Sequence, residues 1–258
     1  MQNFIGVFDS GMGGVTVLAD LVEAMPCENF IFYGDSINAP YGVRSQNDII
    51  ALTDKAVEHL IDRGAKVVVI ACNTATSAAI NHLRDKYPIP IIGMEPAIKP
   101  ALKDNDGGHI AVMATPMTLR LDKFNSLIDR LKGKGKVLKI SSPKLVTMVE
   151  NGVISGIEIE SYIEEIFSDY DAEKMESIVL GCTHFLYLKR VLRNIFGEGI
   201  KIYDGNMGTV NRVKQILMEK SLLTDNQEKG SIKIENSLSD DMVKQSFELF
   251  NKYKELKR

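Results

Sequence analysis

The sequence predicts an α/β fold built on parallel sheets. Short uninterrupted apolar segments such as Ile5–Phe8 and Val67–Ala71 alternate with segments whose apolar residues recur at helical spacing. A continuous apolar run is typical of a strand covered by helices on both faces, which is the arrangement of a parallel sheet. The same order of elements is found in both halves of the chain, so we expect two similar α/β domains.

In the first half, the strand Ile5–Phe8 leads into a glycine-rich turn at 9–14. The helix expected next, Val15–Met25, has apolar residues at helical spacing. Pro88 and Pro90 cannot continue a helix, so they separate the last helix of this half from its last strand. The other expected strands are Phe30–Tyr33, Val67–Ala71 and Ile91–Ile92, and the other expected helices are Ile49–Arg63 and Thr76–Tyr87.

The second half repeats this alternation. Its segment 110–115 is the counterpart of 5–10, and its segment 179–184 is the counterpart of 69–74. From about Val210 we expect mostly helix, with a hydrophilic loop near 224–230. The expected strands are Ile110–Ala114, Val137–Ile140, Ile178–Gly181 and Ile200–Tyr203, and the expected helices are Thr118–Leu131, Ile157–Phe167 and Phe185–Ile195.

Composition argues against several classes of protein. The 258 residues carry 31 basic and 34 acidic side chains, a net charge of -3, whereas a general nucleic-acid binder has a basic excess. No apolar run approaches the ~20 residues of a membrane span, and the N-terminal segment lacks the basic region of a signal peptide. Three cysteines are too few for a disulfide framework. We expect a cytoplasmic protein with reduced thiols and with no nucleic-acid or membrane partner.

Two of the cysteines follow predicted buried strands. Cys72 and Cys182 each precede a predicted helix, where free N–H groups and the partial positive charge of the helix N-terminus favour a thiolate. Ligands of open α/β sheets bind at these carboxyl ends of the strands. Cys27 follows Pro26 in a turn and is interpreted as a bystander. The alternative for Cys72 and Cys182 is that each is an inert, buried apolar residue.

Two thiols at one site are compatible with more than one chemistry. The pair does not form a Cys-x-x-Cys redox motif, and a zinc site would need three or four clustered ligands. A single cysteine nucleophile would need a base, and His184 is close to Cys182 in sequence. The remaining hypothesis is an acid–base pair, in which one thiolate removes a proton from a carbon and the opposite thiol returns one to the other face.

The neighbouring polar residues suit a zwitterionic amino acid. Asp9 offers an acceptor for an ammonium group. Asp35 follows a predicted strand, where a site acid and a turn-forming residue are equally expected. Hydroxyl, amide and backbone donors for carboxylates are offered by Ser10, Tyr41-Gly42, Asn73, Thr74 and Thr183.

These residues fall in five blocks that resemble the glutamate racemases, which interconvert the enantiomers of glutamate without a cofactor and supply D-glutamate for peptidoglycan. Each block is weak alone, but all five in this order along nearly the whole chain are specific. The blocks are Gly6-Val7-Phe8-Asp9-Ser10-Gly11-x-Gly13-Gly14, Tyr33-Gly34-Asp35-Ser36, Pro40-Tyr41-Gly42, Ala71-Cys72-Asn73-Thr74-Ala75 and Gly181-Cys182-Thr183-His184.

The resemblance implies that Cys72 and Cys182 are the catalytic bases, acting on the D- and the L-enantiomer respectively. It also implies two α/β domains, 1–97 with 208–258 and 98–207, with the active site in the cleft between them. No metal or cofactor is implied, and a homodimer is compatible with the family. The implied substrate contacts are Asp9-Ser10, Tyr41-Gly42, Asn73-Thr74 and Thr183-His184, with Glu150 as a further acid near the site.

The chain departs from the family pattern beside these blocks. Leu186 and Tyr187 stand where the family usually has Pro-Leu, Thr147 stands where it has Pro, and Pro116 stands where it is more often small and polar. Related aspartate racemases carry Glu at the position of His184, so His184 favours glutamate. The resemblance therefore predicts glutamate racemase activity. The alternatives are an aspartate or broader-range racemase, a catalytically silent amino-acid-binding relative, and a cysteine hydrolase that uses Cys182 with His184.

Overall fold

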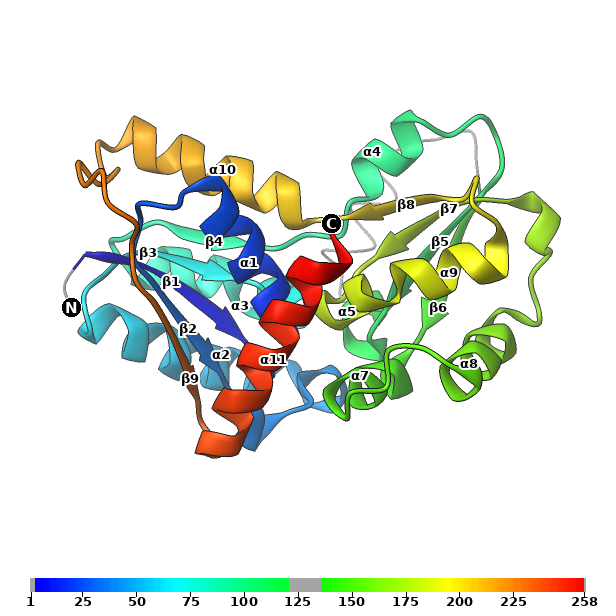
Figure 1. Ribbon diagram of the computed structural model, residues 1–258, viewed down its shortest axis with the longest axis horizontal. Helices are drawn as coiled ribbons and strands as arrows, with labels where there is room; N and C mark the ends of the chain where they lie inside the picture. The colour runs from blue at the N-terminus through cyan, green and yellow to red at the C-terminus, as the bar shows by residue number, and fades with distance from the viewer. Residues whose placement is uncertain (1–2, 121–135, 258) are drawn as a thin grey trace. The chain divides into compact units, whose positions relative to one another are not determined.

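The computed structural model describes residues 3–120 and 136–257, and the chain divides into two compact units (Figure 1). The first comprises Met1–Glu95 with Asn206–Arg258, and the second comprises Pro96–Gly205. In each unit the described strands pair in parallel, so the predicted fold class is confirmed. The part of the predicted helix Thr118–Leu131 beyond residue 120 lies outside the described residues.

The first unit is a parallel sheet with helices on both faces. Its central strand β1 (Phe4–Asp9) is buried at every residue, as its apolar sequence predicts. The strand order is β4-β3-β1-β2-β9, with β2 at Phe30–Gly34, β3 at Ala65–Ile70, β4 at Ile91–Gly93 and β9 at Ile232–Asn236. Helices α2 (Gln46–Asp62) and α3 (Asn73–Lys86) pack together on one face, and α1 (Val15–Ala24) packs with α10 (Asn206–Glu219) and α11 (Asp240–Leu256) on the other.

The chain after Val210 is mostly helical, as expected, but it also contains strand β9, which the sequence did not predict. Ile232–Asn236 pairs in parallel with β2 and extends the sheet at its edge. Within this strand only Ile234 is buried, while Lys233 is exposed and Glu235 is half-buried. Because an edge strand has this mixed polarity, a search for continuous apolar runs does not find it.

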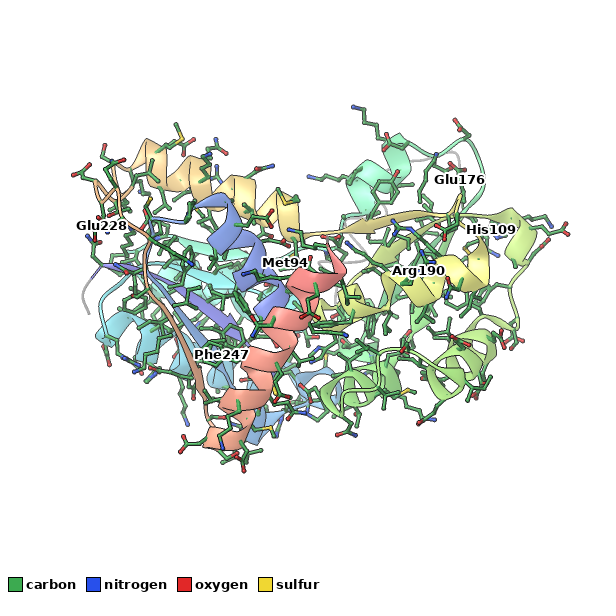
Figure 2. The ribbon with its side chains drawn as sticks, viewed as in Figure 1. Met94, His109, Glu176, Arg190, Glu228 and Phe247 are labelled. Carbon is green, nitrogen blue, oxygen red and sulfur yellow. The ribbon has the colours of Figure 1, made fainter. Side chains whose placement is uncertain are left out.

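One buried carboxylate links the three helices on that face. Asp20 of α1 is 4% exposed, and its Oδ2 accepts hydrogen bonds from Asn206 Nδ2 at 2.6 Å and from the Tyr253 hydroxyl at 3.0 Å. Its Oδ1 accepts a hydrogen bond from Lys257 Nζ at 2.6 Å. Side chains fill the space between these helices and the sheet, and Met94, labelled in Figure 2, is buried there. The start of α10 and the end of α11 are therefore both held against α1.

The second unit contains a parallel sheet of order β6-β5-β7-β8. The helix expected at Phe185–Ile195 starts instead as the 3-10 segment η4 (Thr183–Leu188) and continues as α9 (Lys189–Phe196). Two further helices, α4 (Ile98–Lys103) and α7 (Pro143–Glu150), are too short to give a clear periodic pattern. The remaining elements are β5 (His109–Ala114), α5 (Pro116–Arg120), β6 (Val137–Ser141), α8 (Ile157–Phe167), η3 (Ala172–Lys174), β7 (Met175–Leu180) and β8 (Lys201–Asp204).

The two sheets repeat one pattern of backbone hydrogen bonds. After β3, the Ala71 N–H donates to the Phe8 carbonyl at 2.8 Å, and after β7 the Gly181 N–H donates to the Met113 carbonyl at 2.8 Å. The strand order β2-β1-β3-β4 of the first unit therefore corresponds to β6-β5-β7-β8 of the second. This correspondence supports the internal similarity inferred from the sequence.

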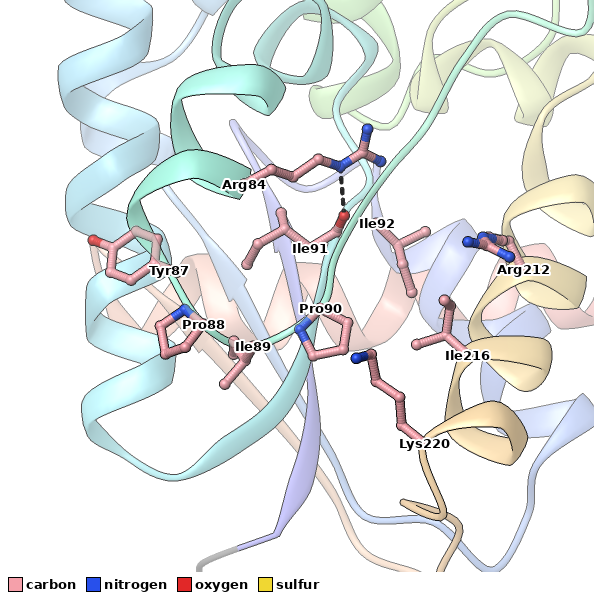
Figure 3. Close-up of a pocket in the computed structure, with 10 residues that line it drawn as sticks. All are labelled: Arg84, Tyr87, Pro88, Ile89, Pro90, Ile91, Ile92, Arg212, Ile216 and Lys220. Carbon is pink, nitrogen blue, oxygen red and sulfur yellow. Dashed lines mark hydrogen bonds between the residues drawn. The ribbon is translucent and has the colours of Figure 1, made fainter.

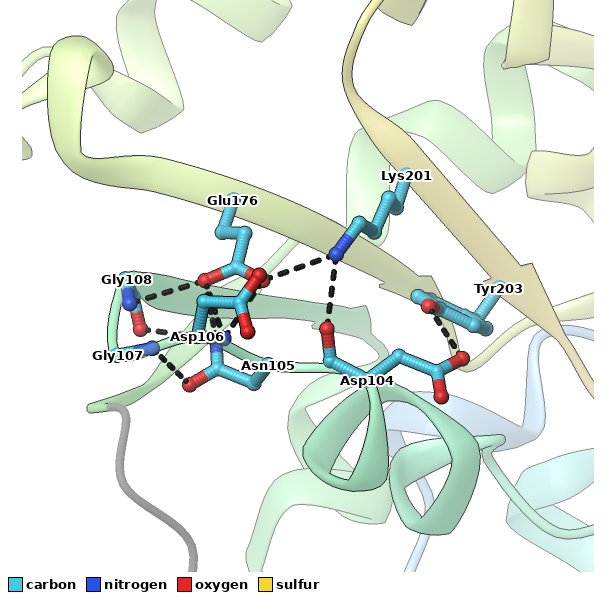
Figure 4. A network of polar contacts seen from close by, with 8 residues as sticks. All are labelled: Asp104, Asn105, Asp106, Gly107, Gly108, Glu176, Lys201 and Tyr203. Carbon is cyan, nitrogen blue, oxygen red and sulfur yellow. Dashed lines mark hydrogen bonds and ion pairs between the residues drawn. The ribbon is translucent and has the colours of Figure 1, made fainter.

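A carboxylate fixes the loop at the amino end of the second sheet (Figure 4). Glu176 accepts hydrogen bonds from the backbone N–H groups of Asp106 and Gly108 at 3.0 Å. It also forms an ion pair with Lys201 at 3.1 Å. Burial alone would raise the pKa of Glu176, but these donors outweigh it and hold the pKa below its usual value. A Cβ atom at position 108 would lie 2.7 Å from the Glu176 Cβ, so glycine is required for this approach.

In the described ranges, no helix is both long and apolar enough to cross a membrane.

A buried ion pair joins β3 to the loop before β2, and both of its side chains also contact the loop after α10. Lys66 Nζ donates to Glu28 Oε2 at 2.6 Å and to the Leu222 carbonyl at 2.7 Å. Glu28 also accepts a hydrogen bond from the Thr224 N–H at 2.9 Å. The Lys66 and Glu28 side chains are 5% and 3% exposed. Since a buried charge is costly without a partner, each of these groups depends on the other.

Replacing Lys66 by Met should strongly destabilise the first unit, because it leaves the Glu28 carboxylate buried without its cation. We expect the free energy of unfolding, measured by urea titration with circular dichroism, to fall by about 3–5 kcal/mol. The control Lys244→Met removes one partner of an exposed pair with Asp241 and should leave the urea midpoint nearly unchanged. Equal effects of the two substitutions would contradict the role assigned to the buried pair.

Candidate active site

Three polar groups of the first unit meet at one edge of its sheet. Strands β2, β1 and β3 are neighbours and run parallel, so their carboxyl ends lie together. Asp9 is the last residue of β1, Asp35 directly follows β2, and Cys72 lies two residues after β3. In an open α/β sheet this edge is the usual place for a ligand.

The Cys72 sulfur accepts hydrogen bonds from two neutral donors. The Ser10 hydroxyl donates to Sγ at 3.2 Å, and the Ala75 N–H donates to it at 3.4 Å. Cys72 is the N-cap of α3, so the sulfur also lies at the positive end of the helix dipole. The residue is 7% exposed. Each of these interactions stabilises a negative charge on the sulfur.

Asp9 is fully buried and lies against the glycine-rich turn. Its Oδ1 accepts a hydrogen bond from the Gly11 N–H at 3.0 Å. A Cβ atom at Gly14 would lie 2.5 Å from the Asp9 Cβ and 3.0 Å from the Ala71 Cβ. Glycine at position 14 therefore allows the start of α1 to approach the ends of both β1 and β3.

Asp35 holds the loop that carries Tyr41 and Gly42. Its carboxylate accepts hydrogen bonds from Asn38 Nδ2 at 3.1 and 3.0 Å and from the Tyr41 hydroxyl at 2.7 Å. Tyr41 begins the 3-10 segment η2 (Tyr41–Val43) and is 1% exposed. Burial raises the pKa of Tyr41, and the hydrogen bond and charge of Asp35 and the charge of Cys72 raise it further. Tyr41 is therefore a neutral donor close to Cys72.

Asn73 and Thr74 form the first residues of α3 and are 5% and 3% exposed. The Asn73 Oδ1 atom is buried and has no hydrogen-bond partner among the described residues. An unsatisfied buried acceptor is costly in a folded protein unless a ligand supplies a donor. Asn73 is therefore a candidate for contact with an ammonium group.

In the second unit, Cys182 is joined through His184 to Glu150. Cys182 follows β7 and is 8% exposed, and its sulfur lies 3.6 Å from His184 Nδ1. His184 Nε2 lies 3.0 Å from Oε1 of Glu150, the last residue of α7. Thr183 is 3% exposed and lies between the cysteine and the histidine in η4. The sequence placed His184 next to Cys182, and the structure shows that the two side chains face each other.

The contacts of His184 favour its charged, imidazolium form. Burial would lower the pKa of His184, but hydrogen bonds with Cys182 and Glu150, and the negative charges of both groups, raise it well above its usual value. The imidazolium lies between a carboxylate and the cysteine sulfur, so it stabilises a negative charge on that sulfur.

The two edges are equivalent in backbone but differ in side chains. Ala114 and Thr115 of the second unit occupy the positions of Asp9 and Ser10, as judged from the matching ladders. The Thr115 hydroxyl lies 3.0 Å from that of Thr118, a residue that the sequence analysis placed in a helix without a site role. Asn38 was also not anticipated as a site residue, since nothing in a single sequence links it to Asp35. Among the described residues, no group of three His, Cys, Asp or Glu side chains is placed to hold a metal ion.

A family model described as Asp/Glu/Hydantoin racemase matches residues 5–213, a range that contains both cysteines. The chain belongs to this racemase family. It is 47% identical over 235 residues to a glutamate racemase of Clostridium novyi, with 91% of each chain covered.

Two solved members of this family resemble the structure. The Francisella tularensis glutamate racemase, in complex with D-glutamate, matches with a TM-score of 0.84 and 26% identity, covering 96% of this chain and 93% of that one. The Escherichia coli glutamate racemase, in complex with L-glutamate and the activator UDP-MurNAc-Ala, matches with a TM-score of 0.85 and 25% identity, covering 98% and 96%.

Replacing Ser10 by Ala should slow the alkylation of Cys72 by iodoacetamide, because the thiolate loses a hydrogen-bond donor. Loss of one such bond, worth about 1–1.5 kcal/mol, corresponds to a decrease in rate of roughly tenfold. Mass spectrometry of the modified peptides measures the rate. Cys27 is only partly exposed and lies away from Ser10 in sequence and contacts, so its rate in the same sample is an internal reference. A Cys72 rate unchanged relative to Cys27 would show that the Ser10 hydroxyl has no effect on the sulfur.

Replacing Glu150 by Gln should move the titration of His184 to lower pH, because the imidazolium loses its carboxylate partner. The imidazole resonances in NMR spectra recorded against pH report this shift. The folded-state pKa of the native His184 is above the ~6.5 of an unfolded chain, so its stabilising effect is fully present below that pH and is lost as the pH rises through the folded-state pKa. The stability deficit of Glu150→Gln should therefore shrink as the pH rises, and a deficit that grows with pH would contradict this assignment.

Proposed function

We propose that the chain is a glutamate racemase that exchanges the proton at Cα of glutamate between two cysteine sulfurs without an organic cofactor. One observation carries the proposal. Cys72 and Cys182 occupy equivalent places at the carboxyl ends of two equivalent sheets, and each has hydrogen-bonding partners that stabilise a negative charge. The 47% identity to the Clostridium novyi glutamate racemase supports the same reaction.

In the proposed reaction the two sulfurs act on opposite faces of the substrate. A thiolate on one face accepts the proton from Cα, so that the C–H bond breaks and an S–H bond forms. The thiol on the other face gives its proton to the carbanion, so that a new C–H bond forms and a thiolate remains. No electrons are transferred, and the product is the opposite enantiomer. The roles of the two cysteines reverse for the reverse reaction.

The polar groups of the first unit are suited to the charges of glutamate. The carboxylate of Asp9 and the unpartnered Oδ1 atom of Asn73 are both hydrogen-bond acceptors, which suits them to bind the α-ammonium group. Thr74 adds a buried hydroxyl, and the backbone at Tyr41-Gly42, held by Asp35, offers donors for a carboxylate. Fixed donors and acceptors in a site with little water stabilise the developing carbanion more than mobile water would.

The imidazolium of His184 supports the base on the other face. Removal of the proton from L-glutamate requires a charged sulfur at Cys182, and His184 lies 3.6 Å from that sulfur with Glu150 behind it. Glu150 keeps His184 charged and holds its ring in place. Both thiols must stay reduced for this chemistry, which favours a cytoplasmic location. The role in supplying D-glutamate for peptidoglycan is proposed from the similarity to glutamate racemases.

The Cys182–His184–Glu150 arrangement also favours a second candidate, a cysteine hydrolase. Such enzymes use a cysteine, a histidine base and a third residue that orients the histidine. That mechanism would use only one cysteine and would leave the strand-end position and hydrogen bonds of Cys72 unexplained. Racemisation accounts for both cysteines, so we favour it.

The decisive experiment incubates the purified native protein with L-glutamate and, separately, with D-glutamate in deuterated water without added cofactor. We expect each enantiomer to convert into the other with deuterium at Cα, as measured by NMR and chiral chromatography. Aspartate in parallel reactions tests the substrate range. Absence of exchange from both glutamate enantiomers would contradict the proposal.

Single substitutions then test the two-base mechanism. Cys72→Ala and Cys182→Ala each remove one proton carrier and should lower the racemisation rate by at least about 10²–10⁴-fold. Cys27→Ala is the matched control and should retain the native rate, because Cys27 contacts the backbone of Gln227 rather than a candidate site residue. Full activity of Cys72→Ala would favour a mechanism with one thiol.

A further inference from the structure

The first unit contains a pocket away from the candidate active site. This β4–α10 pocket is lined by the end of α3, the loop 87–90, β4 and one face of α10 (Figure 3). Its volume is about 380 Å³, within the range of small-molecule sites. The loop 87–90 precedes β4, so the pocket lies at the amino end of this strand. Since the strands are parallel, Asp9 and Cys72 lie at the opposite edge of the sheet.

Positive charge gathers around this pocket. Arg84 from α3, Arg212 from α10 and Lys220 directly after α10 line it, and none of its described lining residues is acidic. None of the three has an ion pair with any residue in the described ranges. Arg84 Nε instead donates to the Ile91 carbonyl at 3.1 Å, and Arg212 donates to the neutral Gln215 at 3.0 Å. The charges of the three side chains are therefore available to a ligand.

The smaller, apolar part of the lining is preformed. Figure 3 shows Ile92 between Arg84 and Arg212, and Pro90 and Ile216 on either side of Lys220. The side chains of Ile92 and Ile216 belong to the core, since the residues are 4% and 9% exposed. Proline restricts the loop backbone, so these walls need little ordering when a ligand enters.

We propose that the β4–α10 pocket binds a small organic phosphate monoester. A phosphate monoester carries about -1.5 to -2 charge near pH 7, which matches several cations better than a single carboxylate does. Arginine forks bind phosphate oxygens in a bidentate manner, and lysine adds a mobile point charge. The smaller apolar part of the lining would contact the organic part of the ligand, a contact that inorganic phosphate cannot make.

Four probes separate these contributions. Phenyl phosphate offers a dianion with an apolar ring, benzoate offers one charge, phenol offers none, and inorganic phosphate lacks the ring. Isothermal titration calorimetry at low ionic strength, with and without saturating glutamate, should show that phenyl phosphate binds the native chain more tightly than the other three. Binding of phenyl phosphate that glutamate abolishes, or that is no tighter than phenol or inorganic phosphate, would overturn the proposal.

A double substitution locates the site. Arg212→Gln with Lys220→Gln changes two exposed side chains, one on α10 and one directly after it, and should weaken phenyl phosphate binding by at least about tenfold. Lys214→Gln is the matched control, because Lys214 is exposed on the same helix but does not line the pocket. Equal affinity of the double variant and the control would place the ligand elsewhere. The assay measures binding alone, so its outcome is independent of whether the chain racemises glutamate.

Discussion

The parallel pairing of β1 with its two neighbours is the constraint on which the candidate site depends. Ladders with β3 and β2 bring the ends of all three strands to one edge, and the Ala71 N–H continues the first ladder onto the Phe8 carbonyl. Cys72 is the next residue, so backbone hydrogen bonds alone fix its position at this edge. Ser10 follows β1 directly, and for this reason its hydroxyl can reach that sulfur.

The second unit has the same backbone arrangement, but different charged groups surround its cysteine. Its ladders place Cys182 as those of the first unit place Cys72, but Ala114 and Thr115 stand in the positions of Asp9 and Ser10. The negative group comes instead from Glu150 at the end of α7, and it acts through His184. Equivalent backbones therefore hold two sulfurs that differ in how a negative charge is stabilised. One depends on neutral donors and the other on an imidazolium.

The sequence was sufficient for features that depend on local pattern, and insufficient for those that depend on distant contacts. Continuous apolar runs predicted β1 and β3, because a strand buried on both faces has no polar alternation to obscure it. The same criterion missed β9, an edge strand in which polar residues flank Ile234. The carboxylate of Asp35 could not be assigned one role from sequence, and its contacts with Asn38 and Tyr41 now identify it as the group that fixes their loop. The roles of the two cysteines stay predictions until they are measured.

The placement of charge at the first edge also bears on when a thiolate forms there. Two carboxylates, Asp9 and Asp35, lie at the same edge as Cys72, and the donors to the sulfur are uncharged. These carboxylates act against a negative charge on the sulfur, whereas its hydrogen-bond donors and the helix N-terminus favour that charge. In the proposed reaction, the α-ammonium group of glutamate would bring a cation to this edge, next to the unsatisfied Asn73 Oδ1. Substrate binding would then favour the thiolate of Cys72, whereas the cation that favours a thiolate at Cys182 is a residue of the chain, His184.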